Sequence, residues 1–286
     1  MNKLSKKINF VLWVEVVLAN PNGDPLADNR PRTDFDGRGL MSGVCIRRKI
    51  RNRLQDMMHN IYIQTDQRAD DGAKDLKERA KDFAKIKDKD EFMEKACERW
   101  TDVRSFGQVL PFSDFACKSV GVYGPVTINH ARTADPINII PMQITKSVSG
   151  ERKANGEKGS DTMGMEYLVE YGLYKIKGSI NAYRAQKTGL TEGDVEAIKK
   201  SLATLFENDD SAARPEGSMR IVQFYWFEHN GKEGQYPAFD VFESVKARKK
   251  DGVRIPNKLD DYIFEFEELP GLKSEVVIDK TRKKQS

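Results

Sequence analysis

The sequence predicts an α+β protein whose core follows the order strand, helix, strand, strand, helix, strand. Residues 8–18 carry apolar side chains on both faces of an extended chain, which is typical of a central strand. Residues 41–59 and 191–207 repeat apolar side chains at helical spacing. The remaining core strands are predicted at 126–130, 174–182 and 219–228. This order is the ferredoxin-like split βαβ arrangement, which RNA-recognition-motif domains share.

The first predicted strand leads into a loop rich in turn-forming residues. Phe10, Leu12 and Val14 share one face of the strand, and Val11 and Trp13 share the other. Residues 20–39 then contain several prolines and glycines, which exclude a regular helix or strand pattern. The loop also carries three arginines, which are Arg30, Arg32 and Arg38.

A strongly basic helix is predicted over residues 41–59. Ser42 is its candidate N-cap. Its apolar stripe consists of Ile46, Ile50, Leu54 and Met57. The rest of the circumference carries Arg47, Arg48, Lys49, Arg51 and Arg53, and no acid falls between residues 43 and 55. Such a positive surface binds phosphate backbones, whereas a solvated surface helix is the alternative interpretation of the same pattern.

Three further segments interrupt or extend the core. Residues 73–100 are dense in Lys, Asp and Glu and sparse in apolar side chains, so a helical insertion on the surface is predicted at 60–119. Residues 149–164 are glycine-rich and charged, so they cannot pack a core and are expected to protrude. Residues 231–286 form a C-terminal extension, in which 262–267 alternate like a strand and 280–286 are expected to fray.

The later core elements have local signals of their own. Thr191 is the expected cap of the second helix, with Asp194 in a capping-box-like position. Residues 174–182 predict a strand with one polar, basic face. The aromatic run Phe224–Phe227 places two rings on each face of its strand, so at least one pair must be buried. We expect all four rings to be mainly structural.

Composition excludes several classes of protein. The 286 residues carry a net charge of only +4, so the total charge does not indicate a polyanionic partner. No apolar stretch is long enough to span a membrane. Glu15 and the turn residues after it argue against a signal peptide. Three widely spaced cysteines suit a reducing compartment, and we therefore expect a cytoplasmic protein.

The sequence has no recognisable enzyme signature. It lacks the nucleophile elbow, the phosphate loop, the dinucleotide fingerprint and the zinc-protease motif. Four aspartates cluster in the first loop, and they are Asp24, Asp28, Asp34 and Asp36. The spacing of the last two suits a divalent ion, whereas the capping of turns is the simpler interpretation.

Nine motifs occur in one order between about residues 8 and 245. They are NPNGDP (20–25), RPRTD (30–34), GLMSGVCIRRKIRN (39–52), DVRSFG (102–107), GPV (124–126), ARTADP (131–136), TMG (162–164), YGLY (171–174) and FENDDSAAR (206–214). In this combination the chain resembles the backbone subunit of the type I-C CRISPR surveillance complex, or Cascade. This is the Cas-seven or Csd-two-type family of the RAMP superfamily.

The resemblance implies an architecture and a set of partners. A palm like an RNA-recognition motif would comprise residues 1–59, 120–148 and 166–230, with a helical finger at 60–119 and a thumb at 143–165. Copies would polymerise head to tail along the spacer of a CRISPR RNA, together with other Cascade subunits. The thumb of each copy would interrupt the RNA, and the guide would pair in segments with a single strand of target DNA. Other proteins cut DNA and process RNA, so the resemblance implies a binding protein with no catalytic residue, metal or cofactor.

The resemblance also implies which residues touch the guide. Its phosphates are expected at the first loop and at the start of the basic helix, on Asn20, Asn22, Arg30, Arg32, Ser42, Arg47, Arg48 and Arg51. Ser105 and Phe106 are expected to contact the guide or a base. Arg132 is a further candidate, because cations interleaved with an aromatic ring suit single-stranded nucleic acid.

The thumb is expected to carry the residues that displace a base. They are Gln143 and Thr145, with Met163 and Met165 as candidate wedges.

Two hypotheses from different classes follow. The leading one is a non-catalytic, guide-RNA-binding filament subunit. The alternative is a metal-dependent endoribonuclease that uses Asp24, Asp28 and Asp34.

Overall fold

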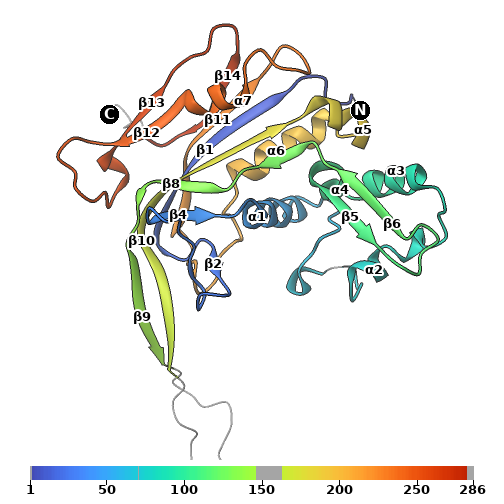
Figure 1. Cartoon of the computed structure of the whole chain (residues 1–286), viewed down its shortest axis with the longest axis horizontal. Coiled ribbons are helices and arrows are strands. Elements are labelled where there is room, and N and C mark those ends of the chain that lie inside the picture. The colour runs from blue at the N-terminus through green and yellow to red at the C-terminus, as the bar shows by residue number, and fades with distance from the viewer. Residues whose placement is uncertain (1, 70, 146–162, 282–286) are drawn as a thin grey trace, which may run out of the picture.

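The computed structural model describes residues 2–69, 71–145 and 163–281, and it is organised around one large antiparallel sheet (Figure 1). The strand order is β14-β11-β1-β10-β8-β4, and β7 and β9 also pair with β10. The strands are β1 (Ile8–Ala19), β4 (Arg38–Met41), β7 (Val126–Ile128), β8 (Ala131–Pro136), β9 (Ile139–Thr145), β10 (Met163–Ile180), β11 (Met219–Glu228) and β14 (Lys273–Asp279).

The central strand is β1, which pairs with β10 on one side and with β11 on the other. Phe10 and Leu12 belong to one apolar cluster, while Val11 and Trp13 belong to a second cluster on the opposite face. The sequence prediction of a central strand is therefore confirmed. The aromatic run of β11 is buried at all four positions, Phe224–Phe227.

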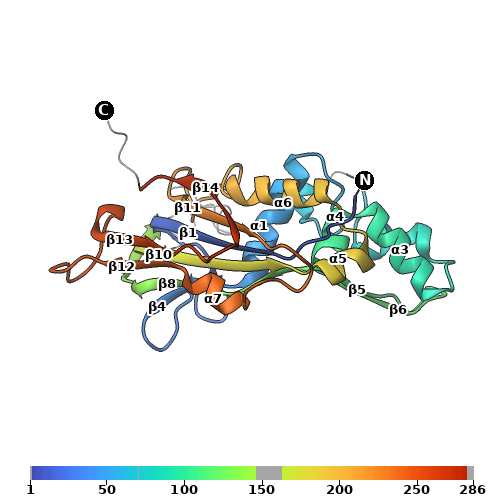
Figure 2. The same cartoon turned by 90° about the horizontal axis from the view of Figure 1, so that it is seen from above.

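Two helices pack on the first of these faces, as Figure 2 shows, and they are α1 (Gly43–Asp56) and α6 (Glu192–Ala203). Both begin where the sequence predicts. The Ser42 hydroxyl accepts the Cys45 N–H, and Thr191 forms a capping box with Asp194. The short helix α5 (Ala182–Thr188) before α6 is an element that the sequence analysis did not predict. Among the described residues, no helix has the length and apolar character needed to cross a membrane.

The C-terminal extension covers the second face. It contains α7 (Ala238–Glu243), β12 (Val245–Lys249), a short 3-10 turn (Leu259–Asp261) and β13 (Tyr262–Phe266). The predicted strand at 262–267 is confirmed as β13, which pairs with β12. The extension then returns as β14, which adds an edge strand beside β11. Fraying was expected at residues 280–286, of which 282–286 lie outside the described residues.

The insertion between α1 and β7, here called the finger segment, comprises residues 60–123 and has its own apolar cluster. The rings of Tyr62 and Phe83 lie 4.6 Å and 5.1 Å from Trp100. The elements are 3-10 turns at Asp66–Arg68 and Lys81–Phe83, α2 (Leu76–Arg79), α3 (Lys89–Arg99), α4 (Thr101–Phe106), β5 (Gly107–Pro111) and β6 (Ser119–Tyr123). The insertion is therefore not purely helical as expected, because it ends in the β5–β6 hairpin.

The first loop and a long hairpin extend from the sheet near the same end (Figure 1). The loop forms the short strands β2 (Gly23–Asp24) and β3 (Arg30–Pro31) before β4, where no strand was expected. β9 and the first half of β10 make the hairpin. The predicted protruding loop at 149–164 lies outside the described residues up to 162, whereas Met163 and Gly164 already belong to β10.

Ile50 tests the packing of α1 on the sheet. Its side chain is fully buried, so Ile50→Ala should lower the free energy of unfolding by about 2–5 kcal/mol. Val44 lies on the same helix and is 65% exposed, so Val44→Ala should change the free energy of unfolding by less than about 0.5 kcal/mol. Urea titration of both variants measures the difference. Equal losses would contradict the burial pattern.

Candidate nucleic-acid interface

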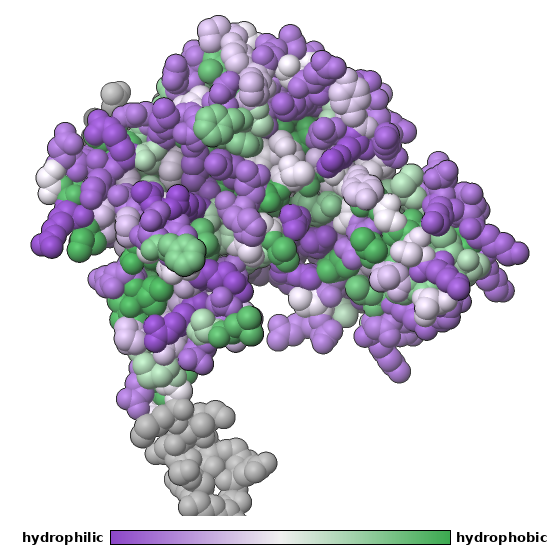
Figure 3. Space-filling view, in the orientation of Figure 1, coloured by the Kyte–Doolittle hydropathy of each residue, from purple (hydrophilic) through white to green (hydrophobic). Residues whose placement is uncertain are grey.

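A groove of about 650 Å³ separates α1 from the finger segment. α1 supplies one wall, and the end of α4 with the β5–β6 hairpin supplies the other. Its lining includes Val44, Arg47, Arg48, Arg51, Phe106, Gln108, Tyr123, Thr127 and Arg184. Figure 3 shows that the molecule is concave along its lower edge, between the β9–β10 hairpin and the finger segment.

Three arginines of this groove form no ion pair with any residue that the structure describes. Within the described residues, no carboxylate lies within ion-pair distance of Arg47, Arg48 or Arg184, and Arg48 donates to the Ile63 carbonyl at 2.7 Å. Burial lowers the pKa of Arg47 and of Arg48, and the nearby charge of Arg51 lowers both further, while the Asp102 carboxylate offsets part of this for Arg48. A bound phosphate would relieve this repulsion, because it accepts charge-assisted hydrogen bonds from guanidinium groups.

Aromatic side chains lie beside these cations. Tyr123 ends β6 and is 82% exposed, and the half-buried Phe106 ring lies 5.0 Å from the Arg51 guanidinium. Exposed rings next to arginines suit unpaired bases, which stack while their phosphates are neutralised. Phe106 was expected in the site, whereas Tyr123 and Arg184 were missed. Tyr123 directly precedes the GPV motif, which is the one signal in the sequence that pointed to it.

Arg51 differs from its neighbours because it forms a buried ion pair. Its Nε donates to the Asp102 carboxylate at 2.8 Å, and Asp102 is fully buried. The same carboxylate accepts the backbone N–H groups of Tyr62 at 2.7 Å and Ile63 at 3.2 Å. The Arg51 side chain therefore joins α1 to the finger segment, where the sequence analysis expected it to grip a phosphate. Ser105, another expected contact, has its side chain inside the protein.

The asparagines of the first loop build its junction with α1. Asn20 is buried and donates to the Asn29 carbonyl at 2.6 Å. Asn22 Oδ1 accepts the Ser42 N–H at 2.8 Å, which fixes the residue that caps α1. A Cβ at Gly43 would approach the Ile128 carbonyl oxygen to 2.5 Å, so only glycine lets the helix start this close to β7. These contacts set the direction in which α1 points its arginines.

The predicted arginines of the loop and of β8 lie outside the groove. Arg30 is exposed and stacks over Tyr167 of β10 at 4.1 Å. Arg32 pairs with Asp24 at 3.1 Å. Arg132 pairs with Asp34 at 2.5 Å and with Asp36 at 2.8 Å. The structure thus brings Arg47, Arg48, Arg51 and Phe106 together but leaves these three arginines on a neighbouring surface.

The same ion pairs occupy the carboxylates of the proposed metal site. Asp24 and Asp34 each face an arginine, and Asp28 lies exposed at a turn with a positive φ of 51°. Among the described residues, no group of three or more His, Cys, Asp or Glu side chains has a geometry that holds a metal ion. The endoribonuclease alternative is therefore not favoured.

The four thumb candidates pair across the β9–β10 hairpin. Gln143 lies opposite Met165, and Thr145 lies opposite Met163. Met165 is 49% exposed, and the neighbouring Ile144 is 50% exposed. The hairpin therefore presents apolar side chains on an arm that extends from the sheet (Figure 1).

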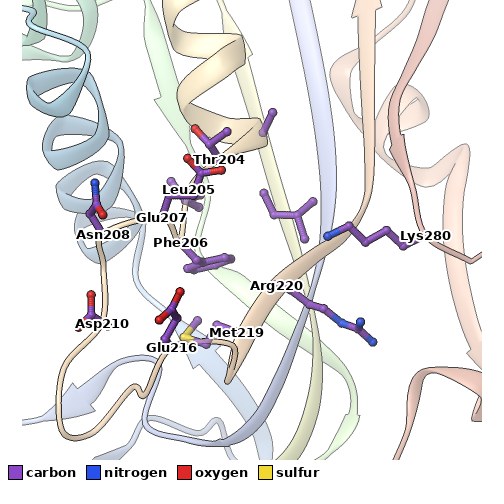
Figure 4. A pocket seen from close by; sticks show the side chains of 12 residues that line it. Thr204, Leu205, Phe206, Glu207, Asn208, Asp210, Glu216, Met219, Arg220 and Lys280 are labelled. Atoms are coloured by element: carbon purple, nitrogen blue, oxygen red, sulfur yellow. The ribbon is translucent and has the colours of Figure 1, made fainter.

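A second hollow, of about 320 Å³, lies at the ends of α6 and β11 (Figure 4). Its charged lining consists of three acids, Glu207, Asp210 and Glu216, and two cations, Lys280 and Arg220, of which Arg220 points away from the acids. Arg220 is also paired with the buried Glu15 at 2.5 Å. The acids of this hollow outnumber its cations, so the groove beside α1 is the better candidate for nucleic acid.

Comparison with known proteins shows the family of this chain. Residues 6–267 match the family model of CRISPR-associated protein Cas7. The chain belongs to the Cas7 family. A CRISPR-associated protein Cas7 from Haloferax volcanii is 29% identical over 200 residues, which is 63% of this chain and 58% of the length of that relative.

A structural neighbour supports the same fold for this Cas7-family chain. A chain of a solved structure described as "CRISPR RNA-guided surveillance complex, pre-nicking" aligns with a TM-score of 0.50 and 15% identity. The alignment covers 77% of this chain and 78% of that one. The mixed α/β architecture with a large antiparallel sheet is thus one that a surveillance-complex subunit also adopts.

Substitution of Asp102 tests how much the buried ion pair with Arg51 stabilises the contact between the two walls of the groove. Asp102→Asn leaves the buried Arg51 guanidinium unpaired, so the free energy of unfolding should fall by about 3–5 kcal/mol. The double variant Arg51→Met/Asp102→Asn removes both charges but keeps an amide oxygen that can accept the Tyr62 and Ile63 N–H groups, so it should recover part of that loss. Urea titration measures both.

Asp82 provides the matched control. It pairs with Arg99 on the surface of the finger segment, where both side chains are exposed, so Asp82→Asn should have little effect on stability. A loss for Asp102→Asn no larger than that of Asp82→Asn would contradict the role assigned to the buried pair.

Proposed function

We propose that this protein is a backbone subunit of a type I-C CRISPR surveillance complex, which binds the CRISPR RNA and presents it to target DNA. The groove beside α1 is the observation that carries the proposal. It combines the exposed ring of Tyr123 with the cations Arg47, Arg48 and Arg184, which form no ion pair within the described part of the chain. Both features suit single-stranded RNA, because cations neutralise its phosphates and aromatic rings stack on its unpaired bases.

The proposed palm corresponds to an RNA-recognition motif. Its support is the order β11-β1-β10 with β7 on the far side of β10, and two helices on one face. In this assignment the palm comprises residues 1–59, 120–148 and 166–230. The finger is 60–119, although the β5–β6 hairpin favours an end near Tyr123.

The proposed thumb is the β9–β10 hairpin, within 143–165. Its apolar side chains Ile144 and Met165 would reach the RNA or a neighbouring copy, and Met163 would act as a base wedge. Copies that associate head to tail form an open filament, because the contacting surfaces differ. The guide sets the filament length, and other Cascade subunits cap its ends.

Arg30, Arg32 and Arg132 have a secondary place in this proposal. They lie near the base of the hairpin, so they would contact the guide as it leaves the groove. Arg51, Ser42, Asn20 and Asn22 act mainly by positioning, because each of them makes a hydrogen bond within the protein. The proposed role is that of a binder in the cytoplasm, with cutting done by another protein.

The double variant Arg47→Gln/Arg184→Gln tests the groove. Neither guanidinium pairs with a described carboxylate, so the fold should be unaffected while two phosphate contacts are lost. We expect the assembled complex to retain about tenfold less guide RNA or even less. The measurement is sequencing and quantification of RNA extracted from complexes purified with the neighbouring subunits and a CRISPR array.

The matched control is Lys85→Gln/Lys87→Gln on the exposed surface of the finger segment. It makes the same change in charge and should retain guide RNA like the parent protein. Normal retention by the groove variant, or RNA of random sequence in the parent complex, would overturn the proposal.

A cleavage assay tests the binding role against the nuclease alternative. Assembled complex incubated with RNA complementary to the guide, in Mg²⁺ or Mn²⁺, should leave that RNA intact, because Asp24 and Asp34 are held in ion pairs. Cuts at a regular spacing that disappear in Asp24→Ala or Asp34→Ala would restore the alternative.

A further inference from the structure

Exposed cations gather at the far end of the β12–β13 hairpin. The segment 246–258, here called the hairpin tip, contains six basic residues and one acid, Asp251. All six basic side chains are exposed, and they are Lys246, Arg248, Lys249, Lys250, Arg254 and Lys258. Figure 1 places this hairpin at the opposite end of the molecule from the finger segment.

Little of this charge is neutralised within the fold. Arg248 pairs with Glu265 at 2.7 Å, and in the described part of the chain no carboxylate lies within ion-pair distance of the other five. Two further acids, Asp260 and Asp261, lie at the base of the tip, and Asp261 accepts the Asn257 N–H at 2.9 Å. Glu267 and Glu268 lie beyond the other end of the hairpin, where Val245 pairs with Phe266. The tip therefore keeps an excess of positive charge that the structure itself does not use.

The finger segment shows that this is not a general property of the surface. Residues 81–91 also carry four lysines, but four acids alternate with them. The lysines are Lys81, Lys85, Lys87 and Lys89, and the acids are Asp82, Asp88, Asp90 and Glu91. Balanced charges of this kind solvate a surface, whereas charges of one sign attract a polyanion.

The hairpin packs on the face of the sheet opposite α1. Val245 and Tyr262 belong to the apolar cluster that includes Trp13, whereas α1 packs on the cluster that includes Phe10. A guide held in the groove would therefore leave the tip free. A second polyanion can reach it without competing for Arg47 or Arg184.

We propose that the hairpin tip binds the phosphate backbone of double-stranded DNA. The aromatic side chains of the hairpin, Tyr262, Phe264 and Phe266, are buried or half-buried, so none stands exposed as a platform for unpaired bases. A DNA duplex carries one negative charge for about 1.7 Å of its axis, which is twice the density of a single strand. A duplex is therefore a better ligand than a single strand for a surface that offers cations without exposed rings. The inference rests on the proposed function, because a filament would repeat the tip at regular intervals beside the guide.

The test compares two variants with the same loss of charge in guide-bound complex. The tip variant is Lys249→Gln/Lys250→Gln/Arg254→Gln/Lys258→Gln, and the control is Lys81→Gln/Lys85→Gln/Lys87→Gln/Lys89→Gln. Binding of a fluorescent DNA duplex unrelated to the guide is measured over a salt series. The tip variant should bind about tenfold more weakly or worse, with a log–log salt slope smaller by about 3–4 for each engaged copy. The control should match the parent.

Equal losses in the two variants would overturn the inference, as would a loss for single-stranded DNA as large as that for the duplex. Guide RNA is quantified in the same samples, which separates this inference from the proposed function. If the parent retains no guide, the proposed function fails, and the same salt series on the guide-free chain still decides whether the tip binds a duplex.

Discussion

The buried ion pair between Arg51 and Asp102 is the contact on which the candidate site depends. It joins α1 of the main sheet to the finger segment, and Asp102 also holds the backbone of Tyr62 and Ile63. The two walls of the groove come from these two parts of the chain. Because a buried guanidinium is costly when unpaired, the pair favours one relative placement of the walls. Phe106, which lies beside Arg51, is placed by the same contact.

The sequence predicted the central elements because their signals are local. The strands β1 and β11 each contain a continuous run of buried side chains, and the helices α1 and α6 each have a buried apolar stripe. The residue that caps each helix directly precedes it in the sequence. The β5–β6 hairpin, α5 and β14 were missed. β14 is short and its first half is charged, so its strand character comes from pairing with β11. The finger segment was expected to be sparse in apolar residues, yet its aromatic side chains converge on Trp100 to form a core.

The site was predicted only in part for the same reason. The basic helix is evident from its sequence, but which arginines remain available depends on partners that are distant in the chain. Asp102 lies 51 residues from Arg51, and Asp34 lies 98 residues from Arg132. Tyr123 and Arg184 enter the groove from separate segments, and no spacing pattern links them to α1. Periodicity therefore identifies the helix, while the pairing of charges decides its chemistry.

The most direct measurement of the central claim is ultraviolet crosslinking of guide RNA in the assembled complex, followed by mass spectrometry of the crosslinked peptides. The account predicts crosslinks on Phe106 and Tyr123, the rings that line the groove beside α1. Crosslinks confined to the acidic hollow of Figure 4 or to residues 246–258 would contradict it, because the guide would then lie elsewhere on the protein.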